Sequence, residues 1–190
     1  MELIFRKFLF SQKLSIYLGL LLVLTFFSAA SVQASPFGQG VFGADVPFGS
    51  ATSISIDLGG NVALSLTPDG GNYKGTQSQV VTVTSTDVVG YYLYAHTNGV
   101  SDMTNGAASI PASNNTSATP LSVGSWGYNT TGSTTNFLGM KNTSSLLVDA
   151  SGPYKNGSPT TVTYGALVSP TQEAGNYSVA VTYTAVAKNQ

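Results

Sequence analysis

The side chains that carry out most hydrolytic chemistry are scarce in this sequence. His96 is the only histidine among the 190 residues, and there is no cysteine. No Gly-x-Ser-x-Gly elbow or Ser-x-x-Lys pair occurs, although such motifs mark many serine enzymes. A single histidine among aromatic residues is typical of a structural role, and a triad assembled from distant residues is the alternative. The sequence therefore predicts a protein that is not an enzyme.

The acidic residues form no metal-binding motif. A closed zinc site needs several histidine or cysteine ligands, and the aspartates show no Asp-x-Asp-x-Asp spacing. Glu173 is the only glutamate after Glu2, so a glycosidase pair would have to come from distant strands. We expect no cofactor and no structural metal. A calcium ion held at a turn by Asp69 or Asp102 with backbone carbonyls is the alternative left open.

Aromatic side chains are the feature best suited to binding. Trp126 and Tyr128 share one short segment, and Tyr92 and Tyr94 alternate along another. Such rings stack on sugars and anchor protein partners. The alternative is that Trp126 fills a core between sheets and that the tyrosines line half-buried strand faces.

The first 34 residues predict a secretory signal peptide. Basic residues precede an apolar run over residues 14–27, and Val32 and Ala34 place small side chains before Ser35. This run is shorter than the roughly 20 residues that span a bilayer, so cleavage after Ala34 is favoured over an uncleaved anchor. We therefore expect an extracellular or cell-surface protein, exported by the Sec route, that meets the membrane only during export.

The chain after Ala34 is weakly charged. It carries four basic and seven acidic side chains, a net charge of about −3, which disfavours nucleic acid as a partner. Abundant Ser, Thr, Asn, Gly and Tyr suit sheets better than helices. An exported chain without cysteine has no disulfides, and this favours a bacterial origin.

The chain is predicted to have three parts: a signal peptide over residues 1–34, an arm or linker over 35–50, and one domain over 51–190. The arm is apolar and punctuated by glycine, and Pro36-Phe37-Gly38 recurs as Pro47-Phe48-Gly49. It shows no clear period. It has either no function or one in which its phenylalanines dock on its own or a neighbouring domain.

Alternation of apolar and polar residues predicts strands through the domain. Runs on either side of Gly59-Gly60 predict a hairpin, and residues 67–72 have strong turn chemistry. Residues 98–120 read as a long loop with one short edge strand near 107–110. The last two runs are predicted to form a central hairpin over Thr160–Ala187. The predicted strands span residues 53–58, 62–67, 77–86, 90–97, 145–148, 160–168 and 177–185.

No helical period follows the leader, and parallel α/β folds need helical crossovers. The predicted fold class is therefore all-β: an antiparallel two-sheet sandwich, immunoglobulin-like or Greek-key, preceded by an N-terminal signal helix.

Two resemblances agree with this class. Residues Glu173, Gly175 and Tyr177 resemble the tyrosine corner of immunoglobulin-like domains, which implies a buried ring whose hydroxyl returns to the backbone; the cysteine pair of those domains is absent. Gly90-Tyr91-Tyr92-Leu93, Trp126-Gly127-Tyr128 and the runs at 161–166 and 174–185 are similar to secreted surface proteins of Saccharibacteria-type candidate-phylum bacteria. That resemblance covers most of residues 52–187 and implies an extracellular β-sandwich, with no activity to carry over.

Three functions are consistent with these observations. The leading hypothesis is a secreted or cell-surface structural or adhesive module, whose partner is a cell-surface protein or a glycan. The first alternative is a carbohydrate-binding module that uses Trp126 or Tyr92 and Tyr94. The second is a pilin-like filament subunit that self-assembles when its arm adds a strand to a neighbour's sheet.

Overall fold

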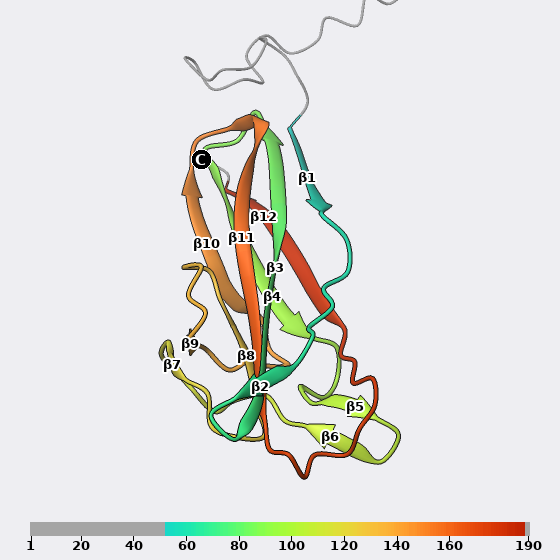
Figure 1. Ribbon diagram of the computed structural model, residues 1–190. Helices are drawn as coiled ribbons and strands as arrows, with labels where there is room; N and C mark the ends of the chain where they lie inside the picture. Colours follow the sequence, from blue (N-terminus) through green and yellow to red (C-terminus); the bar gives the residue numbers. More distant parts are fainter. Residues whose placement is uncertain (1–51, 189–190) are drawn as a thin grey trace, which may run out of the picture. The chain divides into compact units, whose positions relative to one another are not determined.

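The computed structural model describes residues 52–188, where every regular element is a β-strand (Figure 1). All strand pairs are antiparallel, so the predicted all-β, antiparallel class is confirmed. Within these residues there is no helix with the length and apolar character to cross a membrane. The predicted signal peptide and the arm over residues 35–50 lie outside the described residues.

The larger sheet is organised around two long strands. β3 (Asn72–Thr86) and β11 (Tyr154–Val168) pair along nearly their whole length. β1 (Ser53–Leu58) and the short β2 (Thr67–Asp69) pair with the other edge of β3, and β8 (Ser125–Asn129) pairs with β11. The strand order is therefore β1-β3-β11-β8.

The smaller sheet has the order β10-β4-β12, with β10 (Ser145–Ser151), β4 (Gly90–Thr97) and β12 (Val181–Lys188). Its central strand has the predicted alternation and bounds. Tyr91, Leu93 and Ala95 are fully buried, whereas Tyr92 and its two outward neighbours are half-buried. Two small ribbons complete the fold: β5 (Met103–Asn105) with β6 (Ala108–Ile110), and β7 (Thr119–Pro120) with β9 (Asn136–Phe137).

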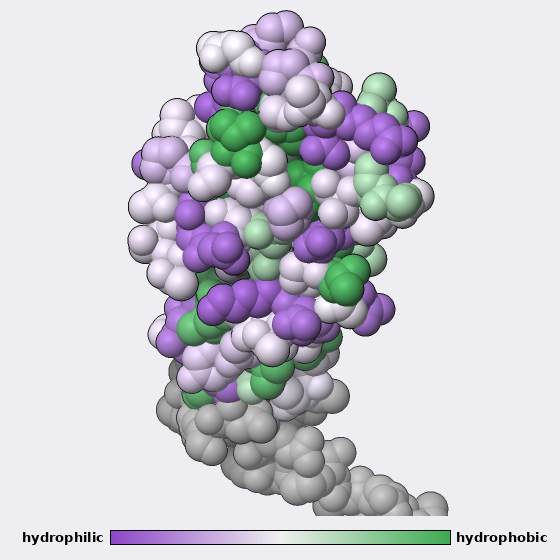
Figure 2. All heavy atoms as spheres, turned by 90° about the horizontal axis from the view of Figure 1, so that it is seen from below, coloured by the Kyte–Doolittle hydropathy of each residue, from purple (hydrophilic) through white to green (hydrophobic). Residues whose placement is uncertain are grey.

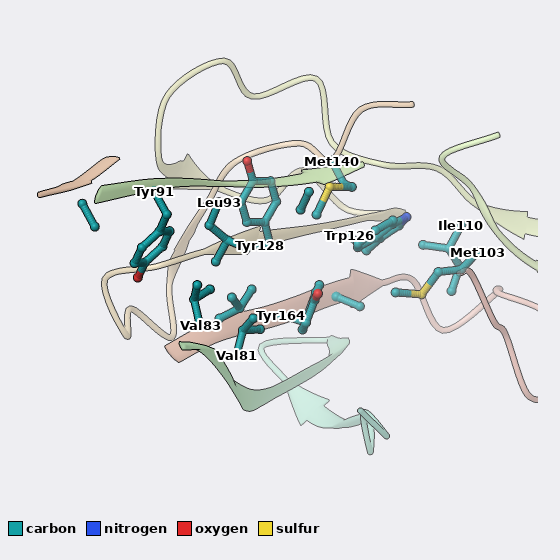
Figure 3. Close-up of a cluster of buried hydrophobic side chains, with 14 of the residues drawn as sticks. Val81, Val83, Tyr91, Leu93, Met103, Ile110, Trp126, Tyr128, Met140 and Tyr164 are labelled. Atoms are coloured by element: carbon teal, nitrogen blue, oxygen red, sulfur yellow. The ribbon is translucent and has the colours of Figure 1, made fainter. Parts of the chain in front are cut away.

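Side chains of both sheets meet in one core. Figure 3 shows Tyr91 and Leu93 of β4 pointing toward Val81 and Val83 of β3, and all four are fully buried. Polar groups also join the sheets: the Tyr91 hydroxyl donates to Ser158 Oγ at 2.8 Å. This arrangement is consistent with a β-sandwich.

The hairpin predicted at Gly59-Gly60 is wrong. Leu58 of β1 is opposite Val81 and Thr67 of β2 is opposite Lys74, so both strands follow the same edge of β3. Eight residues, 59–66, therefore face only six residues of β3, 75–80, and the surplus displaces them from the ladder. The tight turn lies further on, where Gly70 and Gly71 have φ values of +58° and +87° and join β2 to β3. Paired positive φ values of this kind mark a type I′ hairpin.

The predicted hairpin over Thr160–Ala187 is also wrong. β11 lies in the larger sheet and β12 in the smaller one, and residues 169–180 connect them without a strand. Apolar alternation shows which face of a strand is buried, but it does not name the strand's partner. Residues 98–120, expected to hold one edge strand, contain the β5–β6 hairpin and β7 instead.

Candidate functional site

Trp126 and Tyr128 lie in the core. Trp126 is fully buried, its ring centroid is 6.4 Å from that of Tyr164, and its Nε1–H donates to the Ser101 carbonyl at 2.9 Å. Tyr128 is buried, and burial raises the pKa of its hydroxyl. A ring that stacks on a ligand needs an open face, so neither side chain is placed to bind one.

The burial of β8 depends on the glycine between these two aromatics. A Cβ at Gly127 would collide with the Leu138 carbonyl oxygen. Glycine therefore allows the segment around Leu138 to lie against β8, where the Tyr128 and Leu138 backbones exchange hydrogen bonds of 2.9 and 2.7 Å. The result is that all five residues of β8 are buried.

Tyr92 and Tyr94 lie on the outer face of the smaller sheet. Leu146 of β10 is opposite Tyr94, and Val186 of β12 is opposite Tyr92. Directly opposed residues share one face of a sheet, and Leu146 and Val186 are 52% and 45% exposed. We call these four residues the outer aromatic patch.

The patch is bordered by one ion pair. Lys188 Nζ lies 4.5 Å from the centroid of the Tyr92 ring and pairs with the Asp149 carboxylate, a hydrogen bond that raises the pKa of Lys188. The centroids of Tyr92 and Tyr94 are 6.2 Å apart with their planes at 43°. The two rings therefore do not form the flat platform on which successive sugar rings stack.

Glu173, Gly175 and Tyr177 come together in the connection before β12. The Tyr177 hydroxyl donates to the Glu173 carbonyl at 2.7 Å and accepts from Gln172 Nε2 at 2.8 Å. Gly175 lies against Asn105, whose side-chain amide would collide with a Cβ at this position. The Tyr177 ring is half-buried, which departs from the expected full burial.

We expect Tyr177→Phe to lower the free energy of unfolding by about 1 kcal/mol, because one hydrogen bond is lost. Tyr177→Ala should cost about 2 kcal/mol, below the ~3–5 kcal/mol of a fully buried aromatic. Urea unfolding checks both values. Glu173→Gln is the control, since a backbone carbonyl accepts the bond. A loss in this control as large as in Tyr177→Phe would contradict the assignment.

A groove of about 840 Å³ lies beside the core. It adjoins the buried core residues Trp126, Tyr164 and Ala166. Its sides are formed by residues 58–66 and 175–183. Figure 2, which views the molecule from below, shows apolar residues recessed between hydrophilic ones. None of the lining residues carries a charge, so the groove fits an uncharged occupant.

Sequence reasoning missed Leu146, Val186 and the groove. Val186 is at an outward position of the last alternating run, so the alternation itself could have placed it on the outer face. Leu146 lies next to a register shift in β10, so the alternation there does not show which face it is on. The groove is formed by segments more than 100 residues apart in the chain. No local pattern brings them together.

No three His, Cys, Asp or Glu side chains within residues 52–188 are grouped so that they could hold a metal ion. Comparison with protein-family models, with curated proteins and with solved structures finds no match to this chain. The described residues offer two surfaces that could bind a partner, the outer aromatic patch and the groove.

Proposed function

We propose that this chain is an exported, non-catalytic module of the cell surface that adheres to a protein partner through the outer aromatic patch. The patch carries the proposal, because it places two tyrosines, an exposed leucine and an exposed valine side by side on one sheet face. Tyrosine is enriched at the hot spots of protein interfaces, and the buried centre of an interface is more apolar than the surface around it. The leader over residues 1–34 supports export.

We also propose that the two sheets form an immunoglobulin-like sandwich with Greek-key connections. Consecutive strands β3 and β4 lie in different sheets, as do β10 and β11, and β11 and β12. Such alternation between sheets is typical of Greek-key sandwiches. The hydrogen bond from Tyr177 to Glu173 supports a tyrosine corner.

A glycan partner is the second candidate, and the half-buried rings of Tyr92 and Tyr94 favour it. The tilt between these rings and the aliphatic side chains beside them favour protein over sugar. One binding measurement distinguishes a protein partner from a glycan. Saturable binding to a glycan array that is lost in Tyr94→Ala, with the fold retained, would replace the protein partner by a sugar.

We expect Tyr94→Ala and Leu146→Ser each to weaken adhesion about fivefold to thirtyfold, the effect of about 1–2 kcal/mol at a hot spot. The measurement is retention of cells that display the full chain, on surfaces coated with envelope proteins or with glycans. Val80→Ser is the matched control, because Val80 is an exposed apolar residue on the other sheet. Equal retention of all variants and wild type would overturn the patch as the adhesive surface.

A further inference from the structure

The two sheets end in edges that lie close together. β1 closes one side of the larger sheet, β12 closes one side of the smaller sheet, and these strands are in contact. β1 ends at Leu58, and the contact between the two sheet edges ends with it. The Gly59 N–H still donates to the Val80 carbonyl at 3.2 Å, and residues 60–66 then lie outside any strand.

The groove begins at Leu58, where β1 and its contact with β12 end. On one side, β3 residues 75–80 face the displaced segment 59–66 instead of a paired strand. On the other side, Tyr177 and Val179 precede β12 and extend the inward row of Val181 and Tyr183 beyond the strand's first residue. Sheet edges expose backbone N–H and C=O groups that an added strand can pair with.

A part of this chain has the sequence that such a groove requires. The arm as a whole has no clear period, but within it Phe42, Ala44, Val46 and Phe48 alternate with Gly43, Asp45 and Pro47. In a β-strand the first set would share one face and the second set the other. The only charge, at Asp45, would then point away from the uncharged groove. Pro47 lacks an N–H, which is tolerated in an added strand with a free edge.

We propose that residues 42–48 of a second copy of this chain occupy the groove as an added β-strand. The alternating apolar side chains pack against half-buried lining residues such as Val62, Leu64 and Val179, and the backbone runs alongside residues 175–180, which precede β12. Successive copies joined in this way form a chain of subunits. This interaction uses a surface different from the outer aromatic patch, so either can fail without the other.

The position of β1 favours a second copy over the chain's own arm. If the arm turned back along β1 through a two-residue turn, residue 49 would pair with residue 52, and Gly43 would lie opposite Leu58. The alternating residues would then lie along β1, ahead of the groove, of which Leu58 is the first lining residue. Only residues 36–42 would reach the groove, and Gln39 interrupts the apolar pattern there.

Disulfide trapping tests the occupant directly, because the natural chain has no cysteine. One full chain carries Ala44→Cys or Val46→Cys, and a second carries Val62→Cys or Val179→Cys, on the two sides of the groove. The two proteins are mixed and oxidised. The control is Thr182→Cys, which is exposed and outside the groove lining. We expect at least one groove pair to give a mixed disulfide at least tenfold more abundant than the control.

Two other outcomes overturn the proposal. A disulfide that forms only when both cysteines are in one chain would show that the groove takes its own arm. No disulfide from any groove pair would show that the arm does not occupy the groove.

Light scattering of the full chain over a range of concentrations gives a second test. Val46→Asp places a carboxylate toward the uncharged groove, and Gly43→Asp and Pro47→Asp place one on the opposite face. We expect Val46→Asp to weaken self-association at least tenfold, and the two controls to change it less than threefold. Equal effects of all three variants, or a wild-type protein that stays monomeric, would overturn the proposal.

Discussion

Trp126→Ala is expected to lower the free energy of unfolding by about 3–5 kcal/mol, the cost of truncating a large buried aromatic. The indole is fully buried, packs 6.4 Å from the Tyr164 ring, and lies beside Met103 and Ile110 at one end of the core (Figure 3). Its Nε1–H also satisfies the Ser101 carbonyl, which the alanine variant leaves without this donor. The total free energy of unfolding of a domain is about 5–15 kcal/mol, so this substitution would remove a large part of it.

Urea unfolding followed by circular dichroism measures this effect, since the variant loses the only tryptophan. Trp126→Phe is the matched variant, because it keeps an aromatic ring and loses the hydrogen bond, and it should cost clearly less than alanine. An unchanged unfolding midpoint in Trp126→Ala would contradict the core position of this side chain. It would also return Trp126 to the candidate ligand-binding residues.

The sequence predicts the strands of this fold better than their partners. In β4, alternation identifies the buried row, because one face of the strand packs on the core and the other faces outward. In β11 it identifies Val162, Tyr164 and Ala166, although the two residues between them are buried as well. The same alternation at Val62 and Leu64 predicts a strand that does not form. Those side chains do pack toward the core, but their backbone lies outside the ladder because the segment has two residues too many for β3.

Aromatic residues show why the candidate sites are harder to predict than the strands. Trp126 and Tyr92 occur in similar sequence contexts, each close to a glycine and a tyrosine. What separates them is a tertiary contact: the segment around Leu138 covers β8, whereas the described residues leave the outer face of β4 partly exposed. The sequence of one strand does not show which distant segment will cover it.

A cluster of three tyrosines is expected to make the fold unstable at high pH; Tyr128 and Tyr164 are buried and Tyr183 is half-buried. Burial raises the pKa of Tyr128, Tyr164 and Tyr183, and for Tyr164 the nearby Tyr183 raises it further. The hydroxyls of Tyr164 and Tyr183 are hydrogen-bonded to each other, and Gln79 Nε2 donates to Tyr183 at 2.8 Å. Ionising a phenol here places a charge inside the core, between the sheets.

The sign of the pH dependence follows from the direction of these pKa shifts. In the unfolded chain a tyrosine loses its proton near pH 10, while the folded protein retains it. Above about pH 10 the folded state therefore binds more protons than the unfolded state, so stability is present in full below this pH and falls as the pH rises. Each retained proton contributes about 1.4 kcal/mol per pH unit, so three give a slope of at most about 4 kcal/mol per pH unit.

Urea unfolding between pH 7 and pH 12 measures this slope. We expect Tyr164→Phe to reduce it by about 1.4 kcal/mol per pH unit, because one of the retained protons is removed. Tyr73→Phe is the matched control, since Tyr73 is 39% exposed and lies outside the cluster, and it should leave the slope as in wild type. If the wild-type protein is as stable at pH 11.5 as at pH 7, the three hydroxyls ionise in the folded state. Water would then reach the Tyr164 hydroxyl, and this part of the core would not be closed.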